Sequence, residues 1–277
     1  MKSDKKQHDF HLMDSSPWPI IISAAILIFA LGLVGTLREQ VFGIPYLVLG
    51  IFVITLVLFY WWRDVIREAI YDKYHVNMAK NGLKIAMFLF LLSEALFFIA
   101  FFCSFFKAWL YPVFAFEEFF PTKKIGWPPE GILPPDAWSL PFMNTLILLF
   151  SGTTINWAHH SLLENNKENM IKLLSVTILL GILFIIIQAI EYSNLDFSLQ
   201  ETGGKLIYVS NFYMITGFHC IHVIIGIVFL SICLFRARKD QFTPQNHLCF
   251  EFASWYWHFV DMIWIFLFVF VYWLSVF

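Results

Sequence analysis

The chain has 277 residues, of which 59% are hydrophobic and 14% are charged, and its formal net charge at pH 7 is −2. Soluble domains carry about 25% charged residues, so the composition excludes an ordinary soluble protein and indicates a polytopic membrane protein. The small net charge also provides no basic field for binding nucleic acid.

Seven apolar stretches are long enough to cross a membrane, because a transmembrane helix needs about 20 mostly apolar residues. We predict helices at roughly 18–37, 43–62, 83–106, 140–157, 170–192, 206–235 and 250–276. The proline-rich stretch PTKKIGWPPEGILPPDAW (121–138) cannot be helical and is predicted to form a loop outside the membrane. The expected fold class is therefore all-α, with seven transmembrane helices.

The stretches and the segments between them predict a single membrane domain over residues 1–277. Its parts are a polar N-terminal tail (1–16), a two-helix hairpin (17–62), an inner loop (63–82) and a five-helix bundle (83–277). With the N-terminus inside, the inner segments carry eleven Lys and Arg residues and the outer segments five. The positive-inside rule therefore predicts a cytoplasmic or matrix N-terminus.

Glu94 stands alone in the apolar run LLSEALFFIAFF, where a bare carboxylate would be costly. Ten residues beyond Lys84, at about 1.5 Å each, place it about 15 Å deep, near the middle of a membrane core about 30 Å thick. Desolvation disfavours the charged form, so we expect a protonated carboxyl at neutral pH. A hydrogen bond to a neighbouring helix and a role as a proton site remain alternatives.

Ionisable side chains recur in the last two predicted helices, within TGFHCIHVIIG and FEFASWYWHFVDMIW. Two facing histidines would suit a haem, and three converging ligands would suit copper or iron. The alternative, which we favour, is a metal-free network of interhelical hydrogen bonds inside the bundle. Its expected members are His219, His222, Glu251, His258 and Asp261.

The stretch YWWRDVIREAIYDKYH combines indole rings with guanidinium groups where the second predicted helix leaves the membrane. Such a combination suits the phosphate of a lipid, although it also describes an ordinary aromatic belt with inner positive charges. We favour phospholipid binding. The residues assigned to it are Trp61, Trp62, Arg63, Arg67, His75 and Arg236.

The four cysteines lie in or beside apolar stretches and form no C-x-x-C pair. We interpret them as small buried hydrophobic residues rather than as metal ligands or disulfide partners. The sequence contains no hydrolase, phosphate-loop, zinc-protease or dinucleotide fingerprint. We therefore predict neither a catalytic residue nor a metal site.

Seven motifs resemble, in order and spacing, subunit III of the haem–copper cytochrome c oxidases. They are SPWP, WWRDVIRE, SEALFF, WPPEGI, WAHHSL, TGFHCIHVIIG and WYWHFVD. The resemblance extends from about His8 to Trp273. Cys220 and Cys249 depart from the family pattern, because glycine is common at both positions.

This resemblance implies that a V-shaped cleft, filled by phospholipid, separates helices 1 and 2 from helices 3–7. It also implies a subunit with no redox centre of its own, because haem a, haem a3, CuA and CuB belong to subunits I and II. Glu94 matches the family's buried acid, and the resemblance implies a modulatory rather than a catalytic role for it.

The function implied is that of a non-catalytic core subunit of an aa3-type, proton-pumping cytochrome c oxidase. Such a subunit stabilises subunit I, binds phospholipid and supports proton uptake while dioxygen is reduced to water. Its partners would be subunits I and II, with cytochrome c as electron donor. We expect the bacterial inner membrane, with the mitochondrial inner membrane as alternative. A stand-alone proton-coupled transporter is the alternative function, although it would be expected to show inverted repeats.

Overall fold

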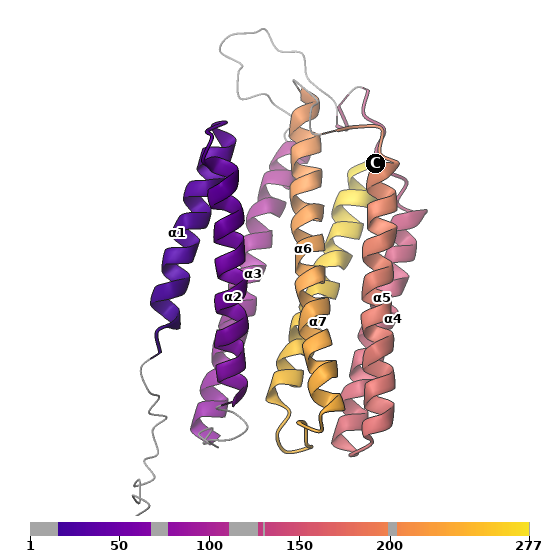
Figure 1. Ribbon diagram of the computed structural model, residues 1–277. Helices are drawn as coiled ribbons and strands as arrows, with labels where there is room; N and C mark the ends of the chain where they lie inside the picture. Colours follow the sequence, from indigo (N-terminus) through magenta and orange to yellow (C-terminus); the bar gives the residue numbers. More distant parts are fainter. Residues whose placement is uncertain (1–15, 68–76, 111–126, 130, 199–203, 277) are drawn as a thin grey trace, which may run out of the picture. The chain divides into compact units, whose positions relative to one another are not determined.

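A computed structural model describes residues 16–67, 77–110, 127–129, 131–198 and 204–276 (Figure 1). Within these ranges the chain is helical, and its one extended pairing is an isolated bridge between Thr243 and Asn246. The α-helices are α1 (Trp18–Leu37), α2 (Gly43–Arg67), α3 (Asn77–Leu110), α4 (Leu140–Leu163), α5 (Lys167–Ser193), α6 (Gly204–Arg238) and α7 (Leu248–Phe266). The prediction of an all-α membrane fold is confirmed.

Six of these helices are long and apolar enough to cross a membrane, and α4 is the one of the seven that is not. Its 24 residues are nevertheless long enough, at about 36 Å, to span the hydrocarbon core. The polar side chains that lower its hydropathy, among them Asn144, Ser151 and Thr154, are buried against neighbouring helices. The length of α4 is thus that of a transmembrane helix, and its polarity is that of an internal one.

Several helix ends differ from the sequence prediction. Helix α3 begins at Asn77 rather than near residue 83, and α4 ends at Leu163 rather than near residue 157. Helix α2 continues to Arg67, so Arg63 and Arg67 lie on its last turns rather than in a loop that begins at residue 63. Beyond α7 the chain widens into a π-helix, Leu267–Trp273, and then a 3-10 turn, Leu274–Val276. That segment, LFVFVYW, contains no Gly or Pro that would have indicated the change.

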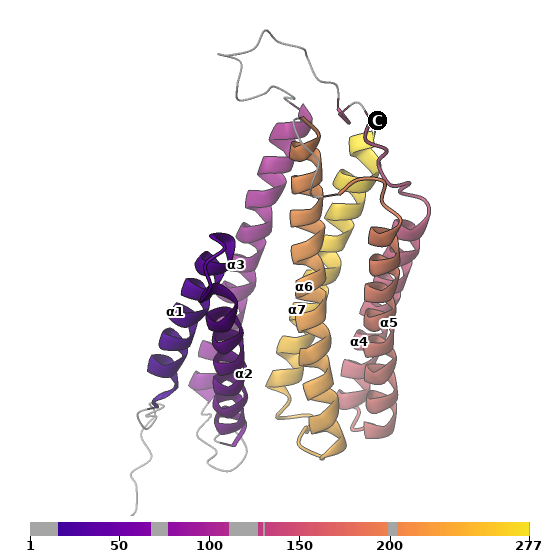
Figure 2. The same cartoon turned by 45° about the horizontal axis from the view of Figure 1, so that its top comes forward.

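The chain divides into two compact units, residues 1–83 and 84–277. In the first unit α1 and α2 form an antiparallel hairpin (Figure 2). Glycine allows their backbones to touch, because a Cβ added at Gly32 would lie 2.2 Å from the backbone nitrogen of Leu47. At the end of the hairpin away from the α1–α2 turn, the indole of Trp18 donates a hydrogen bond to Asp64 over 3.1 Å.

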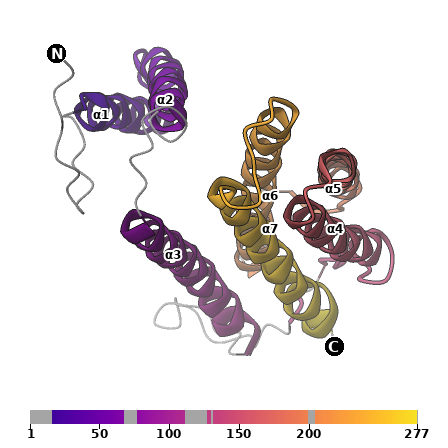
Figure 3. The ribbon, with the colours of Figure 1, turned by 90° about the horizontal axis from the view of Figure 1, so that it is seen from below.

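In the second unit, α4 packs on α5 and α7, and α6 packs on α5 and α7, which gives a ring of four helices (Figure 3). The large side chain of Trp257 fills its centre against Gly181 and Gly226. Its indole donates to the hydroxyl of Ser151 on α4 over 2.9 Å. This satisfied, tightly packed core fixes the rotation of α7 and hence the direction of its polar side chains.

Helix α3 contacts the ring of four helices mainly through edge-to-face pairs of aromatic side chains. The ring centroids of Phe97 and Phe218 are 5.1 Å apart, and those of Phe106 and Phe270 are 5.2 Å apart, both in edge-to-face geometry. Edge-to-face pairs of this kind add about 0.5–1.5 kcal/mol each beyond their buried area. The rows of Phe along α3 therefore hold it against α6 and α7 and set the position of Glu94.

Candidate functional site

Glu94 on α3 and His222 on α6 form a direct contact between two helices. The distance from Oε2 of Glu94 to Nε2 of His222 is 2.9 Å. The other ring nitrogen, Nδ1, lies 2.7 Å from the carbonyl oxygen of Phe218, one turn earlier on α6. Because a carbonyl oxygen only accepts, Nδ1 carries a hydrogen and orients the ring toward Glu94.

This arrangement fixes how many protons the contact contains. With a hydrogen on Nδ1, Nε2 of a neutral imidazole is an acceptor, so Glu94 must be protonated to donate to it. The alternative is an imidazolium that donates to a carboxylate. Both arrangements place one proton between Oε2 and Nε2, whereas its removal would set two lone pairs against each other.

The Glu94–His222 pair lies in apolar surroundings. The rings of Phe98 and His222 have centroids 5.0 Å apart, and Tyr256 stacks near the other side of the imidazole at 6.5 Å. The side chain of His222 is 10% exposed and that of Glu94 is 24% exposed. Glu94 is thus paired, as its position in an apolar run required, and it retains a path to its surroundings.

The other members of the predicted network lie in separate contacts. Glu251 accepts from Lys84 on α3 over 2.8 Å, near the beginning of α7. His219, fully buried, lies 3.2 Å from the carbonyl oxygen of Val260, and because that oxygen only accepts, Nε2 is the donor. The sequence analysis did not predict the contacts of Lys84 and Val260, because a hydropathy pattern does not show how each helix is rotated about its axis.

His258 and Asp261 belong to the interface between α7 and α4. Nε2 of His258 lies 2.8 Å from Oδ1 of Asn156, and its Nδ1 is 3.9 Å from Asp261. Asp261 packs on Gly152, where an added Cβ would lie 2.8 Å from its Oδ2. The described part of the chain contains no group of three or more His, Cys, Asp or Glu residues placed to hold a metal ion.

The structure describes five of the six residues assigned to phospholipid. The guanidinium of Arg63 binds Asp64 over 2.9 Å and lies 5.0 Å from the ring centre of Tyr60. Arg236 donates to Gln241 over 3.1 Å and covers the ring of Phe242. Arg67 and Trp62 are exposed and Trp61 is half-buried on the last turns of α2, and His75 lies outside the described residues.

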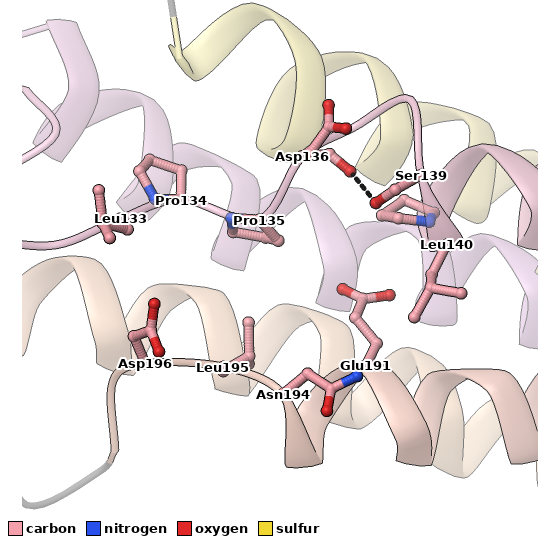
Figure 4. Close-up of a pocket in the computed structure, with 11 residues that line it drawn as sticks. Leu133, Pro134, Pro135, Asp136, Ser139, Leu140, Glu191, Asn194, Leu195 and Asp196 are labelled. Atoms are coloured by element: carbon pink, nitrogen blue, oxygen red, sulfur yellow. Dashed lines mark hydrogen bonds between the residues drawn. The ribbon is translucent and has the colours of Figure 1, made fainter.

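A second buried acid, Glu191 at the end of α5, was missed from the sequence. It points into a cavity of about 240 Å³ between α5 and the segment 133–141 (Figure 4). The residue is 4% exposed, and neither carboxylate oxygen has a hydrogen bond within the described structure, although Tyr272 and Gln188 lie nearby. The only signal in the sequence was an acid two residues before the last residue of the helix.

Polar side chains continue from this cavity into the helix ring. Nε2 of Gln188 donates to the hydroxyl of Tyr272 over 3.3 Å, and its Oε1 accepts from Asn144 over 3.1 Å. These buried groups link α4, α5 and the π-helix. They form a polar chain that starts beside Glu191 and is separate from the Glu94–His222 pair.

The sequence matches one protein family along nearly its whole length. A family model described as cytochrome c oxidase subunit III matches residues 8–276. A probable cytochrome c oxidase subunit 3 from Rickettsia bellii is 49% identical over 269 residues, which are 96% of each chain. Cytochrome c oxidase subunit 3 of Chondrus crispus is 46% identical over 97% of this chain and 94% of its own, and that of Mammuthus primigenius is 42% identical over 96% and 97%. The chain therefore belongs to the cytochrome c oxidase subunit III family.

Proposed function

We propose that the chain is the non-catalytic subunit III of an aa3-type cytochrome c oxidase, in which it stabilises subunit I, binds phospholipid and supports proton uptake. Family membership supports the place in an oxidase. The Glu94–His222 pair supports the link to protons. Haem a, haem a3, CuA and CuB would lie in subunits I and II, and cytochrome c would supply the electrons for reducing dioxygen.

The single observation that carries the proton-linked part is the 2.9 Å contact between Oε2 of Glu94 and Nε2 of His222, from which we infer one shared proton. In apolar surroundings the uncharged arrangement, a carboxylic acid donating to a neutral imidazole, avoids placing two charges in a medium of low polarity. A nearby positive charge or added water would favour the ion pair instead. The pair can therefore respond to its surroundings by moving a proton across a single hydrogen bond.

The proposed location is the bacterial inner membrane, with the N-terminus in the cytoplasm. The Rickettsia relative supports a bacterial setting. The mitochondrial inner membrane, with the N-terminus in the matrix, is the alternative, and the relatives from Chondrus crispus and Mammuthus primigenius keep it open. The excess of Lys and Arg on the predicted inner segments supports the proposed orientation in either case.

Replacing Glu94 by Gln tests the proposal, because an amide can still donate to Nε2 of His222 but cannot release a proton at neutral pH. We expect Glu94→Gln to leave assembly and haem content intact while it alters the number of protons pumped per electron. Infrared spectra of the purified oxidase should show a carboxylic acid C=O band at neutral pH that is missing from the variant.

Ser93→Ala is the matched control, because Ser93 is exposed on the same helix and its hydroxyl donates to the carbonyl oxygen of Phe90. That variant should pump as the parent does and keep the carboxylic acid band. Complete loss of oxidase activity in Glu94→Gln would contradict a modulatory role. A fully ionised Glu94 carboxylate at neutral pH would contradict the shared-proton assignment in its uncharged form.

A further inference from the structure

The structure brings together two cysteines that no sequence motif connects. Cys233 near the end of α6 and Cys249 at the start of α7 have sulfur atoms 4.0 Å apart. The thiol of Cys233 also lies 3.9 Å from the carbonyl oxygen of Cys249. Both are free thiols, and Cys103 and Cys220, the other two cysteines of the chain, lie elsewhere on α3 and α6.

The two sulfurs differ in access and share a neighbouring positive charge. Cys233 is fully buried, whereas Cys249 is partly exposed. Arg236 is close enough to both for its charge to act on them, and it is held in place by Gln241 and by the ring of Phe242. A cation beside a thiol favours the thiolate, which is the nucleophilic form in cysteine oxidation.

We propose that Cys233 and Cys249 are an oxidation site, at which hydrogen peroxide joins the ends of α6 and α7 by an intramolecular disulfide. The more accessible sulfur, that of Cys249, attacks peroxide, the O–O bond breaks, and a sulfenic acid and one water form. The sulfur of Cys233 then attacks the sulfenic sulfur, the S–S bond forms and a second water leaves. Two thiols thus lose two electrons and two protons, and one peroxide becomes two waters.

The movement that this step requires is small. A disulfide bond is about 2.05 Å long, so the two sulfur atoms must approach each other by about 2 Å. Rotation of two side chains on helices that already pack together supplies such an approach. The disulfide would close the short connection between α6 and α7, which includes the Thr243–Asn246 bridge, and would tie the two helices at one end.

The test is to treat the intact oxidase in membranes with hydrogen peroxide, denature it and tag the remaining thiols with a maleimide of known mass. The chain should carry four tags before oxidation and two after it, and four again when a dithiol reductant precedes the tagging. Peptide mass spectrometry should identify one cross-link, between the peptides that contain Cys233 and Cys249.

Cys249→Ser and Cys233→Ser should each abolish the cross-link, whereas Cys103→Ser should retain it and serve as the matched control. The peptide analysis of the parent chain needs no variant, so the test stands even where a serine at the buried position prevents assembly. Four tags after peroxide, a cross-link between other cysteines, or stable sulfinic acid at Cys249 without a cross-link would each overturn the proposal.

Discussion

At the scale of single residues, two buried polar side chains of α5 differ in their hydrogen bonding. Gln188 uses both ends of its amide, accepting from Asn144 and donating to Tyr272, so it links two other buried side chains, although Oδ1 of Asn144 has no partner in the described structure. Glu191, one turn further along α5, is equally buried but has no hydrogen bond within the described structure. Removing a bonded partner is costly, whereas replacing a buried acid that has no partner is not, so the two positions should respond differently.

Gln188→Leu should therefore destabilise the subunit and Glu191→Gln should not. The leucine leaves the amide of Asn144 and the hydroxyl of Tyr272 without a partner, at a cost of about 1–3 kcal/mol for each buried group. The glutamine removes a buried acid while it keeps the shape of the side chain. The half-time for loss of this subunit from the purified oxidase at raised temperature measures both effects.

Glu191→Gln serves as the matched control for Gln188→Leu, because both change a buried polar side chain on the same face of α5. We expect the half-time to fall severalfold in the leucine variant and to stay level or rise in the glutamine variant. A marked fall in Glu191→Gln would show instead that the carboxylate has a partner in the assembled oxidase, reached through the cavity that it faces.

The sequence identified Glu94 as anomalous but did not identify its partner. A lone acid in an apolar run stands out in a hydropathy profile, and helix length alone predicted its depth in the membrane. His222 lies 128 residues away in the sequence. Pairing them requires the rotations of α3 and α6, which the aromatic contacts around Phe97 and Phe218 set and which no single-helix pattern contains.

At the scale of elements, the α1–α2 hairpin depends on glycine. An added Cβ at Gly32 would lie 2.2 Å from Leu47, and one at Gly50 would lie 2.6 Å from Phe29, in each case against backbone atoms. Backbone atoms cannot move aside as a flexible side chain can, so the helices would have to separate. Close approach of this kind is the main source of helix association within a lipid environment.

Gly32→Ala should therefore weaken the hairpin by about 1–3 kcal/mol, the usual cost of overpacking. Gly217→Ala on α6 is the matched control, because an added Cβ there meets nothing within 4 Å and alanine is the better helix former. Protease digestion of the membrane-embedded oxidase should release the hairpin faster in the first variant than in the second. Equal rates would show that the helices are not held by this contact.

The C-terminal end of α2 is the predicted binding site for phospholipid. Replacing Arg63 and Arg67 together by Gln should reduce the anionic phospholipid that copurifies, because two guanidinium groups beside the exposed Trp62 would then be lost. Lipid mass spectrometry of the purified oxidase measures this. Arg38→Gln, at the other end of the hairpin, is the control and should leave the lipid content unchanged. An unchanged content in the double variant as well would refute the assignment.

The elements themselves were predicted well, because each apolar stretch has the length of a membrane span. The C-terminal ends of α2 and α4, the bounds of α3 and the π-helix beyond α7 were not predicted. A helix continues past its apolar part when charged side chains satisfy one another, as Arg63 and Asp64 do. The π-helix at Leu267–Trp273 contains buried residues such as Tyr272, and its sequence has no Gly or Pro that would mark the change.

At the scale of the whole molecule, the outer faces of the helices are covered with large apolar side chains. Leu27 on α1, Phe52 on α2, Ile186 on α5 and Ile225 on α6 are each about half exposed or more. Such a surface would aggregate in water and is the surface that lipid chains cover. The charged residues lie mostly at the helix ends, so the orientation of the chain rests on which ends carry Lys and Arg.

The last prediction follows from that asymmetry. Asp196 follows α5 and Asp240 follows α6, and both are exposed. The helix ends that they follow lie at opposite ends of the second unit (Figure 1). With the N-terminus inside, a membrane-impermeant maleimide added to intact cells should label Asp196→Cys and should label Asp240→Cys only after the cells are opened. The parent chain is the control, because it shows how much labelling comes from its own exposed Cys103. The reverse pattern would invert the orientation that the excess of Lys and Arg predicts.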